Sequence, residues 1–273
     1  MEITEHFIDV RKVFASKNAT LLKIIPGFVI RYLKRIVHED EVNGYIFKHR
    51  DKSGLPFVEA ILREFGVRIQ ASGIQHLESG RYIIVANHPL GGLDGMALMQ
   101  EVGKVRLDLV FPVNDLLMNV PGLQPLFIPI NKHGKNTQNV KIIDETFASG
   151  KVILYFPAGL VSRKMKRGII RDLEWKKTFI SKARKYQRDI IPVYITGRNS
   201  DFFYNLALWR KRIGITANVE MLFLVDEMMK QRDKTISLTF GEPISWTTFD
   251  RTRTDNQWAQ WVKERVYLMA DDG

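Results

Sequence analysis

Six short apolar runs between residues 82 and 240 constrain the fold of this chain more than any other feature. They are rich in Ile and Val, and spans long enough for a helix separate most of them. The runs are YIIVAN (82–87), DLVFPV (108–113), LFIPI (126–130), KVILYF (151–156), IIPVYI (190–195) and ISLTF (236–240). Strands buried on both faces lack polar alternation, so such runs are typical of a parallel sheet covered by helices. They predict an α/β fold with a mostly parallel sheet flanked by helices.

Helical periodicity, by contrast, dominates the chain before the first run. We therefore divide the chain into an N-terminal amphipathic helical region, residues 1–66, and an α/β domain, residues 67–273. One predicted helix covers Pro56 to Phe65. Within Asn18 to Val37, apolar residues share a segment with a mostly basic polar side. That segment either lies in a membrane interface or packs on the α/β core.

The composition limits the possible chemistry and partners. The formal net charge is +11 and the sequence pI is about 9.7, which favours an acidic partner such as nucleic acid, anionic lipid or an acidic carrier protein. Cysteine is absent, which excludes a thiol nucleophile, a thiolate metal site and a disulfide. No uninterrupted apolar run reaches the roughly 20 residues of a spanning helix, so we expect none.

The first run ends in a segment that suits acid–base chemistry. His88 follows the predicted strand, the loop contains Gly91 and Gly92, and Asp94 opens the next helical span. Functional residues of such sheets collect on loops at the carboxyl ends of strands. A histidine there can act as a general base, with the carboxylate orienting its ring. The alternative for Asp94 is a purely structural helix N-cap.

The segment NHPLGGLDG resembles the first motif of the lysophosphatidic-acid-type glycerolipid acyltransferase family. Three further blocks follow in the order of that family: GLQPLFIPIN (122–131), LYFPAGLVSRK (154–164) and IIPVYITG (190–197). A terminal FGEPI (240–244) also recurs there. The resemblance implies a lipid O-acyltransferase that needs no metal and no organic cofactor. Its donor is implied to be an acyl thioester of acyl carrier protein or coenzyme A.

Some positions depart from the pattern of the family. Five residues separate His88 from Asp94 instead of four, and Ala158 replaces the glutamate of the third motif. The arginines that hold the phosphate of the acceptor in the family align with Ile130 and Val161, and an aliphatic side chain cannot replace a guanidinium. The chain looks most like the branch that acylates mono-acylated amino-acid lipids, those of glycine, serine or ornithine.

The resemblance assigns site residues. His88 is the general base and Asp94 supports it, while backbone N–H groups of Gly91, Gly92 or Gly159 stabilise the oxyanion. The remaining predicted oxyanion- or acceptor-binding residues are Asn87, Asn131, Lys132, Ser162, Arg163 and Lys164. Arg163 or Lys164 would meet the carboxylate of the acceptor; the alternative is a solvated loop.

The partners follow from the same resemblance. The basic segment Ser162 to Arg188, with Trp175, Phe179 and Tyr186 among its bases, suits an anionic donor, or is a solvated helix face. Nucleic acid is disfavoured because no nucleic-acid-binding motif accompanies it. Asn18 to Val37 is expected on an anionic membrane surface, the cytoplasmic face of a bacterial inner membrane.

Two alternative functions of the whole chain stay open. It is either a lysophosphatidic acid acyltransferase or a non-catalytic membrane-binding homologue.

Overall fold

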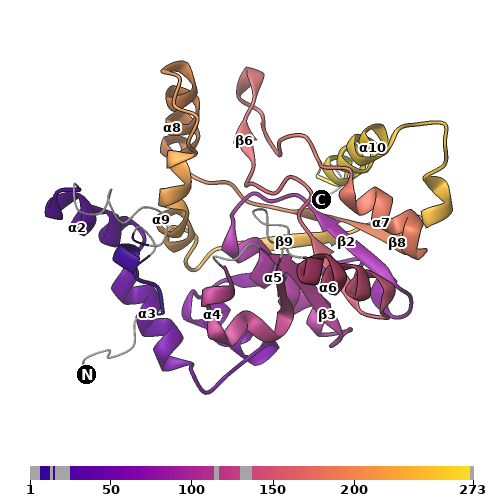
Figure 1. Ribbon diagram of the computed structural model, residues 1–273, viewed down its shortest axis with the longest axis horizontal. Helices are drawn as coiled ribbons and strands as arrows, with labels where there is room; N and C mark the ends of the chain where they lie inside the picture. Colours follow the sequence, from indigo (N-terminus) through magenta and orange to yellow (C-terminus); the bar gives the residue numbers. More distant parts are fainter. Residues whose placement is uncertain (1–6, 13–14, 16–24, 114–116, 130–136, 271–273) are drawn as a thin grey trace.

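A computed structural model describes residues 7–12, 15, 25–113, 117–129 and 137–270 of the chain. Its centre is a seven-stranded sheet with the strand order β1-β9-β8-β2-β5-β3-β4 (Figure 1). The strands are β1 (Arg68–Ser72), β2 (Tyr82–Ala86), β3 (Leu109–Val113), β4 (Phe127–Pro129), β5 (Val152–Tyr155), β8 (Asp189–Ile195) and β9 (Thr235–Phe240).

All neighbouring strands run parallel except β8 and β9, which are antiparallel. All six apolar runs form strands of this sheet, so the predicted mostly parallel α/β fold is confirmed. Strand β1 was not predicted; its residues are largely exposed at the edge of the sheet. An edge strand with little buried surface needs no apolar run, and it therefore leaves no such signal.

Helices cover both faces of the sheet. They are α2 (Gly27–Ile36), α3 (Glu39–Lys48), α4 (Leu55–Glu64), α5 (Gly92–Gly103), α6 (Thr137–Ala148), α7 (Thr178–Tyr186), α8 (Asp201–Arg212), α9 (Leu224–Met229) and α10 (Asp255–Leu268). The 3-10 turn η5 (Val219–Phe223) connects to α9. A two-stranded antiparallel hairpin, β6 (Arg163–Lys164) and β7 (Ile170–Arg171), stands apart from the main sheet.

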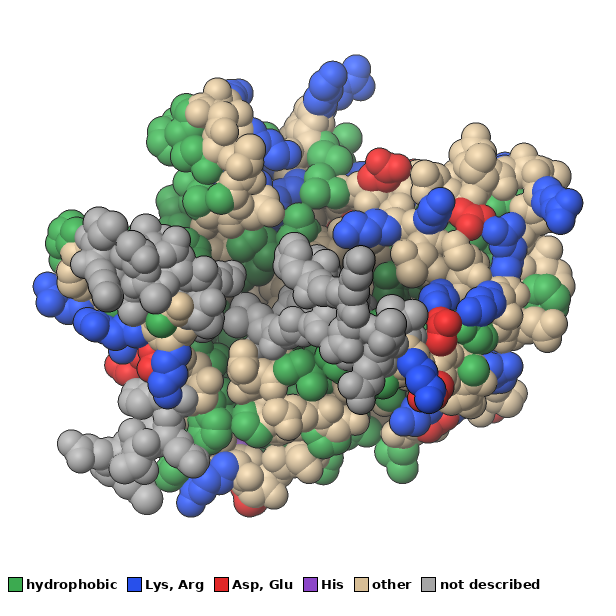
Figure 2. All heavy atoms as spheres, in the orientation of Figure 1, with side chains coloured by type: hydrophobic (Ala, Val, Ile, Leu, Met, Phe, Trp, Pro, Cys, Tyr) green, Lys and Arg blue, Asp and Glu red, His purple; other side chains and the backbone are tan. Residues whose placement is uncertain are grey.

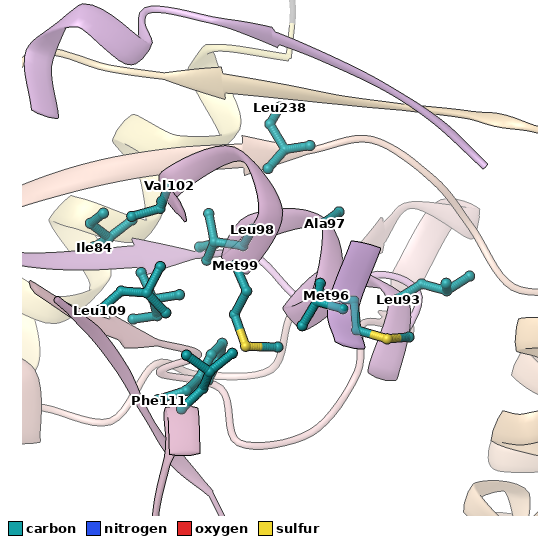
Figure 3. Packing of buried hydrophobic residues seen from close by; sticks show 14 of the residues in the cluster. Ile84, Leu93, Met96, Ala97, Leu98, Met99, Val102, Leu109, Phe111 and Leu238 are labelled. Atoms are coloured by element: carbon teal, nitrogen blue, oxygen red, sulfur yellow. The ribbon is translucent and has the colours of Figure 1, made fainter. Parts of the chain in front are cut away.

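The side chains of β2 explain why its run is apolar throughout. Ile84 and Ala86 pack in a core that includes α4 and α5, whereas Ile83 and Val85 pack in the core beneath α7 and α10. Figure 3 shows the first of these cores, where Met96, Met99 and Val102 of α5 lie among Ile84 and side chains of β3. Alternate residues of a strand point to opposite faces, so a strand with a core on each side is apolar at every position.

Helix α4, at the end of the N-terminal region, packs in the core that also contains α5. Phe57, Val58 and Leu62 of α4 are buried in the main core, so this helix packs as part of the α/β body. Its bounds lie within one residue of the predicted helix Pro56 to Phe65. The division of the chain at residue 66 stays a prediction.

Helix α2 divides its apolar residues between the interior and the surface. Ile30, Leu33 and Ile36 are buried, whereas Phe28 and Tyr32 are exposed. Part of the segment Asn18 to Val37 thus packs on the protein; residues 18–24 lie outside the described residues. No helix in the described ranges combines the length and the apolar character needed to cross a bilayer.

Candidate active site

The site forms where β2 ends, at the carboxyl edge shared by the parallel strands β2, β5 and β8. There His88 Nδ1 lies 3.0 Å from Asp94 Oδ2. The five intervening residues form a tight loop, in which Gly91 adopts a φ of +83° and a ψ of −126°. A side chain disfavours that conformation, and glycine accepts it readily. The longer spacing therefore still brings the imidazole and the carboxylate together.

Asp94 combines the two roles that the sequence analysis treated as alternatives. It lies in the first turn of α5, where Oδ2 accepts hydrogen bonds from the backbone N–H groups of Leu90, at 2.7 Å, and Gly91, at 3.0 Å. The same oxygen accepts from His88, so one carboxylate caps the helix and orients the imidazole.

The carboxyl group of Asp94 is fully buried, and its second oxygen, Oδ1, has no hydrogen-bond partner among the described residues. Burial raises the pKa of Asp94, because the charged form loses its hydration. The hydrogen bonds from His88, Leu90 and Gly91 act in the opposite direction. The capping contacts and the imidazole thus favour the ionised form that a supporting carboxylate needs.

The imidazole of His88 is held between Asp94 and an aromatic ring. Phe156, which follows β5 in the third sequence block, stacks on it with ring centroids 4.0 Å apart. The side chain of His88 is 17% exposed, and its Nε2 has no hydrogen-bond partner in the described part of the chain. One ring nitrogen is therefore fixed by Asp94, while the other can exchange a proton with a bound molecule.

The main chain of His88 is held by two residues from beyond β5. The carbonyl oxygen of His88 accepts from Ser162 N at 2.8 Å, and its N–H donates to Asp172 Oδ1 at 3.2 Å. The hydroxyl of Ser162 donates to the same Oδ1 at 2.6 Å. Ser162, predicted to bind the acceptor, is buried and holds the histidine loop in place.

Asp172 was missed by the sequence analysis. It is fully buried, and its Oδ2 accepts from Trp175 Nε1 at 2.9 Å. Its backbone N–H donates to the hydroxyl of Tyr267 at 2.7 Å, and its carbonyl oxygen accepts from Lys263 Nζ. Burial raises the pKa of Tyr267 and lowers that of Lys263. The sequence around Asp172 carries no signal for this role, because His88, Lys263 and Tyr267 lie more than 80 positions away in the chain.

Two of the three predicted oxyanion amides are already engaged. The N–H of Gly91 donates to Asp94, and that of Gly159 donates to the carbonyl oxygen of Phe156 at 3.1 Å. Gly92 is the first residue of α5, and its N–H makes no hydrogen bond within the described ranges. Of these three, Gly92 retains a free amide that could meet a developing oxyanion.

Asn87 is a structural clamp in this geometry. Its Nδ2 donates to the carbonyl oxygen of Ile195 at 2.8 Å, and its Oδ1 accepts from the N–H of the same residue at 2.7 Å. The buried amide therefore joins the ends of β2 and β8. This contact keeps the strand end before His88 in register with its neighbour.

Arg163 does not face an acceptor. Its buried guanidinium donates to Glu220 Oε1 at 2.8 Å and to the carbonyl oxygen of Val161 at 2.7 Å. A cation with these partners is unavailable to a carboxylate of a lipid, so the prediction for Arg163 is wrong. Lys164 is partly exposed and lies 3.8 Å from Asp201 Oδ1, so its ammonium group remains accessible. Asn131, Lys132 and the aligned Ile130 lie outside the described residues.

The basic segment Ser162 to Arg188 is less open than its sequence indicates. Trp175 and Phe179 are buried in the core, and Arg188 is buried with its guanidinium donating to carbonyl oxygens such as that of Phe147. Lys182 and Lys185 pair with Asp144 of α6. Trp175, Phe179 and some of the basic side chains predicted to form an exposed surface are thus used within the fold, whereas Lys166, Arg167, Lys176 and Lys177 are exposed. Within the described ranges, no three His, Asp or Glu side chains lie where they could share a metal ion.

Comparisons with known proteins identify the family of this chain. The sequence profile of a family described as Acyltransferase matches residues 12–272. A lyso-glycine lipid O-acyltransferase of Bacteroides thetaiotaomicron is 49% identical over 265 residues, which cover 96% of this chain and 97% of that protein. A protein of the same name from Phocaeicola vulgatus is 48% identical, over 96% of this chain and 95% of its own.

The fold has a counterpart among solved structures. The crystal structure of the 1-acyl-sn-glycerophosphate (LPA) acyltransferase PlsC from Thermotoga maritima matches with a TM-score of 0.50 and 16% sequence identity. The match covers 88% of this chain and 95% of that one. At this identity the similarity extends to the fold alone.

Proposed function

This chain belongs to the acyltransferase family, and on that premise we propose that it transfers a fatty acyl chain from an acyl thioester to the hydroxyl group of a mono-acylated glycine lipid. Membership confirms the resemblance on which the sequence analysis relied. The proposed acceptor rests on two relatives that share almost half of their residues with this chain over nearly its whole length, and both are named for a lyso-glycine lipid.

The contact between His88 and Asp94 carries the proposal for the reaction. Asp94 holds Nδ1, so Nε2 is left to take the proton from the hydroxyl group of the acceptor. The hydroxyl oxygen then attacks the carbonyl carbon of the thioester. The imidazolium that forms lies against the Asp94 carboxylate, which stabilises its charge.

Collapse of the tetrahedral intermediate completes the transfer. The carbon–sulfur bond breaks, the new ester remains on the acceptor, and the proton on His88 passes to the departing sulfur. The N–H of Gly92 is our candidate donor to the oxyanion, because Gly91 and Gly159 use theirs within the fold. The donor thioester is proposed to be that of acyl carrier protein or coenzyme A, and the reaction uses no metal and no cofactor.

The choice against lysophosphatidic acid rests on the third sequence block. Val161 occupies the position of a phosphate-holding arginine of the family; it is buried against Phe203 and Tyr204 and cannot contact a phosphate. Arg163, the next guanidinium in the chain, is committed to Glu220. The accessible cation nearest in sequence is Lys164, which we propose as the partner of the glycine carboxylate. We place the reaction on the cytoplasmic face of the inner membrane, where both substrates would be present.

The test supplies purified protein with an acyl thioester and either the mono-acylated glycine lipid or lysophosphatidic acid. We expect kcat/KM for the glycine lipid to be larger by at least about tenfold. His88→Ala should reduce transfer by at least about 100-fold without unfolding the protein, since the main chain of His88 is held by Ser162 and Asp172.

His76→Ala is the matched control, because His76 is a half-buried histidine that pairs with Glu242 and precedes β2, whereas His88 follows that strand. It should leave turnover unchanged. Preference for lysophosphatidic acid would refute the assignment of the acceptor, and appreciable turnover by His88→Ala would refute the general base. No turnover of either acceptor with several thioesters would favour a non-catalytic homologue.

A further inference from the structure

Two elements project from the body beside the active site. The β6–β7 hairpin follows the loop after β5, and α8 follows the loop after β8, so both leave the carboxyl edge of the sheet, where His88 lies. Figure 1 shows the hairpin and α8 rising next to each other beyond the rest of the molecule, and the two elements are in contact.

These projections carry four of the eight large apolar side chains that are more than half exposed in the described ranges. Phe202, Trp209 and Ile213 of the α8 region and Ile169 of the hairpin are each more than half exposed, and Met165 is more than a third exposed. Figure 2 shows hydrophobic side chains gathered on the projecting α8. Exposed patches of this kind mark an interaction site, because a monomer in water gains nothing by presenting them.

The surface is built rigidly. Glu220 of η5 is fully buried and receives the guanidinium groups of Arg163 from the hairpin and Arg210 from α8. Phe223 packs both with the cluster of α2 and with that of the hairpin and α8. Helix α2, which contacts η5, also carries the exposed Phe28 and Tyr32.

Basic residues surround the apolar side chains. Lys166 and Arg167 are exposed at the tip of the hairpin, which Figure 2 shows capped by Lys and Arg, and Lys211 and Arg212 end α8. The exposed acid of α8, Asp201, lies against Arg198 and Lys164. Aromatic side chains among lysines and arginines are the composition that favours the headgroup region of an anionic bilayer. A convex, projecting surface can enter a fluid lipid layer, whereas an acidic protein would leave Trp209 and Ile213 without a pocket.

A pocket lies between the bases of the two projections. It has a volume of about 350 Å³, and its lining includes Ile170 of the hairpin, Arg198 before α8, and Asn87 and Pro89 on either side of His88. A lipid that leaves a bilayer between the hairpin and α8 would thus arrive beside the histidine loop.

We propose that the β6–β7 hairpin and α8 form a docking surface for an anionic lipid bilayer, and that docking places the carboxyl edge of the sheet at the level of the acceptor. This inference deepens the proposed function and depends on it for the identity of the acceptor. The docking itself depends on the surface alone, so it can be tested without a substrate.

The experiment measures co-sedimentation of the full chain with phosphatidylcholine vesicles and with vesicles that also contain phosphatidylglycerol. We expect binding to the mixed vesicles, and at least about tenfold weaker partition for the double variant Ile169→Ser with Trp209→Ser. Lys166→Glu with Arg167→Glu should weaken binding to the mixed vesicles by a similar factor and make it less sensitive to salt. Leu107→Ser is the matched control: Leu107 is 80% exposed but lies between α5 and β3, and the change should leave binding unaltered.

Trp209 also supplies a direct signal, because it is the exposed one among the five tryptophans of the chain. Its fluorescence should shift to the blue on addition of mixed vesicles. Trp209→Phe should keep the partition and lose the shift. Thermal unfolding of each variant verifies its fold, since the substituted side chains are exposed.

Two results would overturn the inference. One is unchanged partition for both double variants. The other is a wild-type protein that does not bind vesicles but is captured by immobilised acyl carrier protein, when the same substitutions abolish that capture. This result would make the surface a protein-docking site. Turnover with a detergent-dispersed acceptor separates the two proposals, because the variants should keep it if only docking is lost. A wild-type protein that binds vesicles but transfers no acyl chain would refute the proposed function and support the docking surface.

Discussion

Substitution of Asp94 separates helix capping from support of the imidazole. In Asp94→Asn the amide oxygen can take the place of Oδ2 and still accept from Leu90, Gly91 and His88. The negative charge is lost. Two unit charges 3 Å apart attract each other by about 5 kcal/mol at an effective dielectric constant of about 20. Since the hydrogen bond is retained, we expect a loss of about 3–4 kcal/mol of transition-state stabilisation, a decrease in kcat of about 10²–10³-fold.

The stability of the same variant should change little. The new amide nitrogen occupies the place of Oδ1, which is buried without a partner, and an unmet donor costs about 1–3 kcal/mol. Removal of a buried charge, whose cost appears as the raised pKa of Asp94, offsets this loss. Asp94→Ala differs, because Leu90 and Gly91 both lose their acceptor; we expect the free energy of unfolding to fall by about 2–5 kcal/mol.

The assay combines urea denaturation of both variants with initial rates of acyl transfer under saturating substrate. A folded Asp94→Asn protein with slow turnover supports the dual role of the carboxylate. A wild-type rate in that variant, alongside a destabilised Asp94→Ala protein, would show that Asp94 caps α5 and contributes nothing to the reaction.

Three further predictions concern charged side chains that are paired within the fold. Asp172→Asn turns an amide N–H toward either Trp175 or Ser162, so the free energy of unfolding in urea should fall by about 1–3 kcal/mol. We also expect kcat to fall; an unaltered kcat would show that Asp172 does not position His88. Glu220→Gln leaves Arg163 and Arg210 buried without a counter-charge and should lower the free energy of unfolding by about 3–5 kcal/mol. Its control is Glu264→Gln, which breaks the exposed pair with Arg171 and should lower the same quantity by less than about 1 kcal/mol. Lys182 and Lys185 lower the pKa of Asp144 to about 2, so its contribution to stability is present above the ordinary aspartate value of about 4 and is lost as the pH falls toward 2. Wild type should therefore exceed Asp144→Asn by under about 1 kcal/mol at neutral pH, and the difference should vanish in acid denaturation near pH 2.

The features that the sequence determined by itself are local. Strands β2, β3, β5 and β8 are apolar runs because a core lies on both of their faces, and hydrophobic periodicity records burial directly. The pairing of His88 with Asp94 is local too. It spans six positions and needs a turn that Gly91 permits, so the order of the residues almost specifies the contact.

Tertiary structure decided what surrounds that pair. Asp172 reaches the main chain of His88 from 84 positions away, and Arg163 turns inward because Glu220, 57 positions further on, receives it. In the basic segment Trp175 and Phe179 are core residues, whereas the exposed apolar surface formed on the hairpin, which belongs to the same segment, and on α8. Whether a charge is free or paired depends on which distant element packs against it. That is settled by the packing of the whole chain, and no local pattern of residues records it.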